Sequence, residues 1–188
     1  MNSAIPPALT PTLLASVAPH QDQAKAAQQA AILRAIAPDG QTILASYGID
    51  TPLRTAHFLA QLAHESDGFC TTQEYASGEA YEGREDLGNT KPGDGVRFKG
   101  RGLIQLTGRR NYREIGARLG LDLENNPESA AEPLTSLRIA CEYWLSRDIN
   151  AAADADDLEA VTRLVNGGLR GFDHRRACLA RARAALGC

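Results

Sequence analysis

The chain has 188 residues, of which 43% are hydrophobic and 5% aromatic, and its formal net charge is −3. This size suits one domain with a real core, and abundant alanine with few aromatic residues favours packed helices and argues against a β-sandwich. No apolar run is long enough to span a membrane.

The sign of the charge alternates along the chain. Residues 89–118 carry eight basic and two acidic side chains, residues 161–188 carry six and one, and the remaining stretches are acidic. The two basic blocks either share a face that attracts an anionic polymer or form ordinary solvated helix faces, and the sequence leaves both interpretations open.

The four cysteines do not form a C-x-x-C pair, so no zinc or redox motif is present, and we expect mostly free thiols. Residues 1–20 lack a basic n-region and contain four prolines. We therefore expect a Pro-rich N-terminal leader, loosely ordered or wrapped on the domain, and no signal peptide. Residues 21–188 are expected to form a single catalytic domain.

Helices are predicted along most of this domain. Residues 21–37 are expected to form a helix that stops at Pro38-Asp39-Gly40, and residues 41–47 a shorter helical piece. Thr51-Pro52 is typical of a helix start, with an N-cap followed by proline at the first helical position. This apolar helix should end near Glu65, because Gly68 follows.

The central segment, residues 66–102, is different because it is rich in glycine and polar residues and shows little periodicity. Such a long segment is usually functional or disordered. Leu103-Ile104-Gln105-Leu106 predicts a brief strand, and Thr107 is expected to cap a helix that ends at Gly120.

Three further helices complete the prediction. They are expected over residues 133–147, with Leu145 on the apolar side, from a cap at Asp156 or Asp157 to Val165, and over residues 172–186. The expected fold class is therefore mainly α, with a loop-rich central segment and at most a small β element.

Glycosidic hydrolysis requires one carboxylic acid and one carboxylate that face each other across a cleft. Glu65 lies at the end of an apolar helix, where partial burial and the helix dipole favour the protonated form, although the spacing alone favours an ordinary solvated carboxylate. Glu74 follows in a loop, where functional residues are common. Three other loop acids compete with it as the second carboxylate, namely Glu79, Glu82 and Glu85.

Two other motifs are excluded. His64-Glu65 begins like the zinc pattern H-E-x-x-H, but Gly68 stands where the second histidine is required. Residues 95–100 begin like a phosphate-binding loop, but Arg101-Gly102 replaces the required Lys-Ser/Thr.

Several blocks together resemble glycoside hydrolase family 19, which contains chitinases and related bacteriophage endolysins. The blocks are His64-Glu65-Ser66, Glu74-Tyr75-Ala76-Ser77, residues 87–95 (LGNTKPGDG), residues 98–108 (FKGRGLIQLTG), Asn111-Tyr112 and Asn166-Gly167-Gly168. The short form of the block at residues 88–95 is similar to the endolysin branch. The resemblance covers about residues 40–186 and implies a lysozyme-like, two-lobed helical fold with an inverting mechanism.

The resemblance also implies roles for individual residues. Glu65 would be the general acid, Glu74 the general base that activates water, and Thr107 the residue that helps to hold that water. Five more residues match positions that bind the sugar polymer or, for the arginine, pair with the catalytic carboxylates: Gln105, Asn111, Tyr112, Asn166 and Arg175, with Arg176 as the alternative arginine. Tyr112 either stacks on a sugar ring or belongs to the core.

We therefore expect an endolysin of the muramidase type that hydrolyses the β-1,4 bonds of bacterial peptidoglycan. The alternatives are a chitinase and a catalytically silent wall-binding protein. We expect no cofactor and no metal, a partner consisting of peptidoglycan glycan strands, no nucleic acid, no stable membrane insertion, and a monomer. Without a signal peptide, the protein would be made in the bacterial host cytoplasm and reach the wall after release by a holin-like partner.

Overall fold

The computed structural model describes residues 7–20 and 22–188, and within them the fold is helical. The only β contacts in this part are isolated bridges, Gln73 to Arg101 and Arg101 to Leu106. The elements are α1 (Pro11–Val17), α2 (Gln23–Ser46), α3 (Pro52–Glu65), η1 (Glu79–Tyr81), η2 (Glu85–Leu87), α4 (Asp94–Arg97), α5 (Arg109–Leu119), η3 (Pro127–Ala131), α6 (Pro133–Ser146), α7 (Ile149–Asp154), α8 (Leu158–Asn166) and α9 (Phe172–Leu186). The expected mainly α class is confirmed.

Helix α3 is the buried centre of the fold. Its start is the predicted one, because Thr51 accepts a hydrogen bond from the Arg54 backbone N–H at 3.2 Å. Every residue from Thr55 to Ala63 is buried, and Phe58 meets the edge of Trp144 on α6 with ring centroids 5.3 Å apart. A helix enclosed in this way holds the residue at its end, Glu65, in a fixed place.

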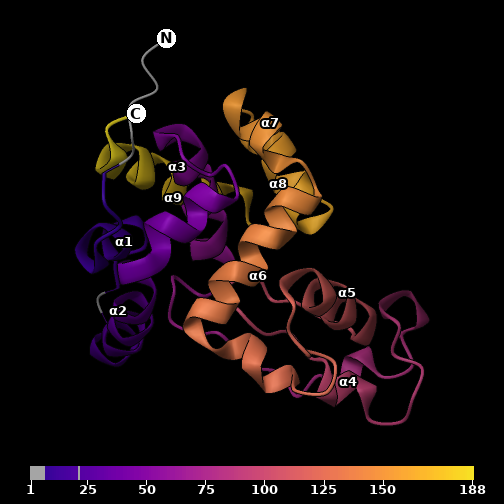
Figure 1. The fold of residues 1–188 in the computed structure, drawn as a ribbon. Helices are drawn as coiled ribbons and strands as arrows, with labels where there is room; N and C mark the ends of the chain where they lie inside the picture. The colour runs from indigo at the N-terminus through magenta and orange to yellow at the C-terminus, as the bar shows by residue number, and fades with distance from the viewer. Residues whose placement is uncertain (1–6, 21) are drawn as a thin grey trace.

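The helices form two unequal parts (Figure 1). Helices α1, α3, α7, α8 and α9 gather in one part, with α9 lying along α3, and the loop-rich segment with α4 and α5 forms the other. Helix α6 runs between them and contacts α2, α5 and α7.

The glycine-rich loops are held by buried polar side chains. Asn89 is fully buried and donates to the Tyr81 carbonyl at 2.9 Å, while its side-chain oxygen accepts from the Arg109 N–H at 2.8 Å. Asp94 is also buried and pairs with the guanidinium of Arg109, which binds Glu124 at 2.9 Å as well. Arg109 of the first basic block therefore neutralises internal acids, which leaves fewer free charges than the sequence count indicates.

The N-terminal part distinguishes between two alternatives that the sequence left open. Residues 9–18 are wrapped on the domain, because α1 buries Leu14 and Val17 in the core and Arg181 of α9 donates to the Val17 carbonyl at 2.7 Å. Residues 1–6 and 21 lie outside the described part.

The helix stop predicted at Pro38-Asp39-Gly40 does not occur, because α2 continues through Pro38 to Ser46. A proline inside a helix costs about 3 kcal/mol. Burial of Leu33, Ile36 and Leu44 along the same helix offsets this cost, since each buried aliphatic side chain contributes about 1.5–3 kcal/mol.

The segment before α5 also differs from its prediction. Residues 102–105 form a turn closed by the bridge between Arg101 and Leu106, so the predicted strand is absent from this described segment. Thr107 does not cap α5, since the cap position is Gly108 and the Thr107 hydroxyl donates to the Gln105 carbonyl at 2.9 Å.

The C-terminal helices follow their predictions more closely. Asp157 caps α8, Gly167 ends it, and α9 has the predicted bounds. Leu145, which was expected on the buried side of α6, is 51% exposed, and α7 was not predicted.

All four cysteines are free, and only Cys188 is exposed. None of the helices in the described residues has the length and apolar character needed to cross a bilayer.

Candidate active site

Glu65 ends α3 and faces a hollow between the two parts of the molecule. Its side chain is 19% exposed, and its Oε1 atom accepts a hydrogen bond from Arg175 Nη2 at 2.5 Å. Arg175 comes from α9 and is 1% exposed, so the ion pair joins the two central helices from within. The pairing of Arg175 with a candidate catalytic carboxylate, which the resemblance implied, is present.

Arg175 is itself held on both sides. Its Nη1 atom donates to Gln61 Oε1 on α3, and its Nε atom donates to the Arg170 carbonyl at 3.1 Å. The alternative arginine, Arg176, pairs instead with Asp173 at 3.2 Å and lies on the exposed side of α9. Arg175 is therefore a fixed, buried cation behind Glu65.

Of the two candidate catalytic carboxylates, Arg175 binds Glu65, which the resemblance implies as the general acid. The contact occupies Oε1 only, and no hydrogen bond within the described residues uses Oε2. Oε2 is thus the oxygen that is left free to contact a ligand in the hollow.

The hollow continues as a groove along both sides of Glu65. A cavity of about 240 Å³ and another of about 560 Å³ share Glu65 and Asn166, and the first also shares four residues with a third cavity of about 380 Å³. Polar lining residues of the first cavity include Glu65, Gln105, Thr107, Asn111, Tyr143, Arg147 and Asn166. Such an elongated polar groove suits an extended polymer better than a compact apolar ligand.

Three of the predicted site residues come together on the turn before α5. Asn111 donates to the Thr107 carbonyl at 2.7 Å, Thr107 donates to the Gln105 carbonyl, and Gln105 donates to the Gly102 carbonyl at 2.9 Å. Gln105 has a positive φ of 55°, which is rare for a residue other than glycine and is typical of functional sites. These local bonds fix the side chains on one wall of the groove.

Glu74 lies behind this wall. Its Oε1 accepts from the Tyr81 hydroxyl at 2.9 Å, and its Oε2 accepts from the Gly100 N–H at 3.0 Å. A Cβ at Gly100 would lie 2.8 Å from Gln105 Oε1 and 3.1 Å from Glu74 Oε2, so both side chains converge on this glycine. Glu74 is thereby linked through Gly100 and Gln105 to the cavity that Glu65 lines.

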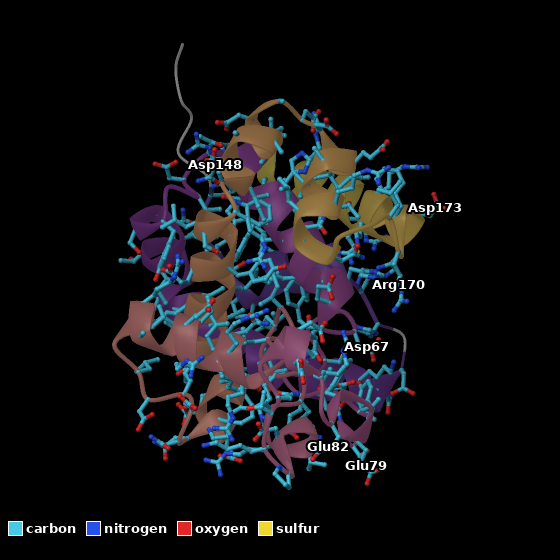
Figure 2. The ribbon with its side chains drawn as sticks, turned by 90° about the vertical axis from the view of Figure 1, so that its right-hand side faces the viewer. Asp67, Glu79, Glu82, Asp148, Arg170 and Asp173 are labelled. Atoms are coloured by element: carbon cyan, nitrogen blue, oxygen red, sulfur yellow. The ribbon has the colours of Figure 1, made fainter. Side chains whose placement is uncertain are left out.

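The competing loop acids have other surroundings. Both oxygens of Glu82 accept backbone N–H bonds, from Gly93 at 2.7 Å and Gly95 at 2.8 Å. Glu79 is exposed, and Figure 2 shows both labelled acids at the end of the molecule away from Arg170. Their positions favour structural or surface roles over a role beside Glu65.

Tyr112 requires a correction. It is fully buried, it donates to the Lys99 carbonyl at 2.7 Å, and Arg101 donates to its hydroxyl at 3.1 Å. Burial raises the pKa of Tyr112 to about 12. Its ring cannot stack on a sugar, because the core encloses it, and the alternative of core packing holds.

The histidine beside Glu65 is part of the supporting structure. His64 Nδ1 lies 3.0 Å from His174 Nδ1, and the ring packs against Gly171. Burial, then Arg175 and His174, lowers the pKa of His64 to about 4. In the described part of the chain, no three side chains of the metal-binding types gather into a metal site.

Sequence reasoning missed four residues around the site. Gln61 orients Arg175, Tyr81 holds Glu74, and Tyr143 with Arg147 forms part of the groove wall. Gln61 lies one helical turn before Glu65 on α3, which is a usable signal, but no spacing rule points to the other three.

Comparisons with known proteins agree with this geometry. A family model described as chitinase class I matches residues 44–169. A Haemophilus influenzae protein named as containing a glycosyl hydrolase family 19 domain is 34% identical over 160 residues, covering 68% of this chain and 78% of that one. Acidic endochitinase Q of Nicotiana tabacum is 33% identical over 145 residues, and the match covers 65% of this chain but only 54% of the plant protein.

Solved structures show the same fold at lower identity. Chitinase C from Streptomyces griseus superposes with a TM-score of 0.68 at 21% identity, covering 96% of this chain and 77% of that chain. A class IV chitinase from Zea mays gives 0.64 at 17% identity, covering 93% and 90%.

Proposed function

Because the chain belongs to glycoside hydrolase family 19, we propose that it hydrolyses β-1,4 glycosidic bonds of bacterial peptidoglycan, as an endolysin of the muramidase type. The observation that carries this proposal is the pair formed by Glu65 and Arg175, which holds one carboxylate at the floor of an elongated polar groove.

In the proposed mechanism, Glu65 gives its proton to the leaving glycosidic oxygen, and Glu74 takes a proton from the water that attacks the opposite face of the sugar. The Thr107 hydroxyl can donate and accept, and it would help to hold that water. An inverting pair requires carboxylates about 6.5–9.5 Å apart, and we propose this separation for the carboxylates of Glu65 and Glu74.

Charge in the groove supports a wall polymer as the substrate. Arg118, Arg147 and Arg170 line its cavities, against Glu114 and Glu65 on the acidic side. Peptidoglycan carries free carboxylates on its stem peptides, whereas chitin is neutral, so cationic walls would attract the former.

A chitinase is the second candidate, because plant relatives such as endochitinase Q carry that name. A silent binding protein is the third, because a relative from Hevea brasiliensis, 30% identical, is named inactive chitinase-like protein 1. The presence of Glu65, Glu74 and Thr107 supports an enzyme here.

The test is mass spectrometry of the fragments released from purified cell walls. A muramidase leaves N-acetylmuramic acid at the new reducing end, and N-acetylglucosamine there, or cleavage of chitin oligomers alone, would contradict the proposal. Glu65→Gln is expected to abolish lysis while keeping the wild-type fold by circular dichroism, and near-wild-type activity of this variant would remove Glu65 from the mechanism.

We further propose that the protein acts as a monomer on glycan strands, without metal or cofactor. It would reach the wall from the bacterial host cytoplasm after release by a holin-like partner. Blocking the holin in an expressing cell should then prevent lysis.

A further inference from the structure

We propose that Arg147 is a carboxylate-binding subsite that recognises the stem-peptide carboxylates of peptidoglycan beside the bond to be cut. This inference rests on the proposed function, because it names the substrate group that the same groove would select.

Arg147 is placed next to the proposed acid. It follows the last residue of α6 and lines the same cavity as Glu65 and Asn166. It also lines the adjoining cavity of about 380 Å³. A sugar bound over Glu65 would therefore have its neighbour or its substituent within reach of this guanidinium.

The guanidinium of Arg147 is oriented in advance. Its central carbon lies 3.6 Å from the centroid of the Tyr143 ring, which is close stacking of a planar cation on an aromatic face. The ring is itself anchored, because the Tyr143 hydroxyl donates to the Val165 carbonyl at 2.6 Å. Little side-chain freedom would be lost when a ligand binds.

The charge of Arg147 has no acidic partner. Among the described residues, no carboxylate forms an ion pair with it and no carbonyl accepts from it. The other groove cations near it are engaged, since Arg175 binds Glu65 and Arg118 approaches Glu142 at 3.4 Å. A planar guanidinium with free donors fits a carboxylate with two parallel hydrogen bonds.

The surroundings indicate one carboxylate at this point of the groove. Glu114 lines the cavity of about 380 Å³ and would repel a second anion farther along it. Peptidoglycan presents carboxylates on every second sugar, and chitin presents none. The subsite would thus select for the muramic unit and fix the register in which the strand crosses Glu65.

The experiment compares native sacculi with sacculi whose carboxylates have been amidated by carbodiimide coupling to methylamine. Wild-type kcat/KM should be at least about tenfold higher on native sacculi, and Arg147→Gln should lose about tenfold on native material only. Arg147→Lys keeps the charge without the planar fork and should be intermediate. Arg34→Gln, which removes an exposed cation from α2, is the matched control and should keep the preference.

A binding measurement distinguishes the proposed Arg147 subsite from the proposed hydrolytic function. A disaccharide-tetrapeptide and its amidated form are titrated calorimetrically into Glu65→Gln protein with and without Arg147→Gln. Tighter binding of the native fragment that disappears with Arg147→Gln supports the subsite, even if wild-type protein fails to cut sacculi, which would refute only the proposed function. Equal binding of the two fragments, or no binding of either, overturns the subsite whatever the hydrolysis result.

Discussion

Adding one methyl group at Gly100 should disturb Gln105 and Glu74 at once, on the same wall of the candidate active site. Gly100 has no positive φ, so its backbone accepts alanine, and the effect comes from contacts alone. The new Cβ would lie 2.8 Å from Gln105 Oε1 and 3.1 Å from Glu74 Oε2, where ordinary contact begins at 3.4 Å. The two side-chain ends must therefore move by about 0.6 Å and 0.3 Å.

These shifts are small for the fold and large for catalysis. The displaced atoms are ends of flexible side chains, so Gly100→Ala should cost about 1 kcal/mol of unfolding free energy. A misplacement approaching 1 Å at a reacting group costs up to about a hundredfold in rate, and we expect kcat to fall about 10- to 100-fold.

The assay is the initial rate of wall clearing on permeabilised Gram-negative cells, read beside the thermal midpoint Tm. Gly40→Ala is the matched control, because Gly40 is also buried and its Cβ would meet Leu9 at an acceptable 3.4 Å, far from the groove. Gly40→Ala should keep full activity and an equal or higher Tm. If Gly100→Ala keeps wild-type kcat as well, the contact between Gly100 and Glu74 does not affect the rate of catalysis.

Three further outcomes are expected. Glu74→Gln should lower kcat about a hundredfold or more, whereas Glu79→Gln should not, and the reverse result in a rate assay would reassign the base. Tyr81→Phe removes the hydroxyl that holds Glu74 Oε1, so kcat should fall roughly tenfold with Tm nearly unchanged; an unaltered rate would show that this bond is dispensable. The pKa of His64 is lowered to about 4 in the fold and is near 6.5 when unfolded, so the unfolded chain binds the extra proton between these values. Urea unfolding should therefore show stability falling as pH drops from about 6.5 to 4, by about 1 kcal/mol after solvent screening, and His64→Gln should flatten this slope.

Helix limits with local signals could be predicted from the sequence. The cap at Thr51, the cap at Asp157 and the glycine at 167 act through bonds within a few residues, so their pattern is visible in the chain. The start and end of α9 follow from the same kind of signal, since both flanking glycines adopt the left-handed conformation.

Features that depend on distant partners could not be predicted. Pro38 remains helical because one face of α2 buries Leu33, Ile36 and Leu44, and Leu145 is exposed because α6 turns that position toward solvent. Thr107 was predicted to cap α5, but its hydroxyl donates to the Gln105 carbonyl in the turn over residues 102–105. For Pro38, tertiary burial outweighs a local cost of about 3 kcal/mol, whereas for Thr107 one local hydrogen bond takes the place of another.

The candidate site also contains residues that the sequence predicted and residues that it did not. Glu65, Gln105, Asn111 and Asn166 were identified through motif blocks, and the groove brings them together. Tyr112 belongs to the same block but is in the core. Arg147 was missed because it lies 82 positions after Glu65 in the sequence, and only the folded chain brings both residues to the same cavity.

The packing of α1 and α9 on α3 has a practical consequence for anyone who wishes to transplant this module into another protein. The region matched by the family model, residues 44–169, leaves out α1, most of α2 and all of α9. A fragment with those limits would lose the cation that faces Glu65 and would leave the apolar surface of α3 open to water. The smallest unit worth grafting therefore begins before Leu9 and continues through Leu186.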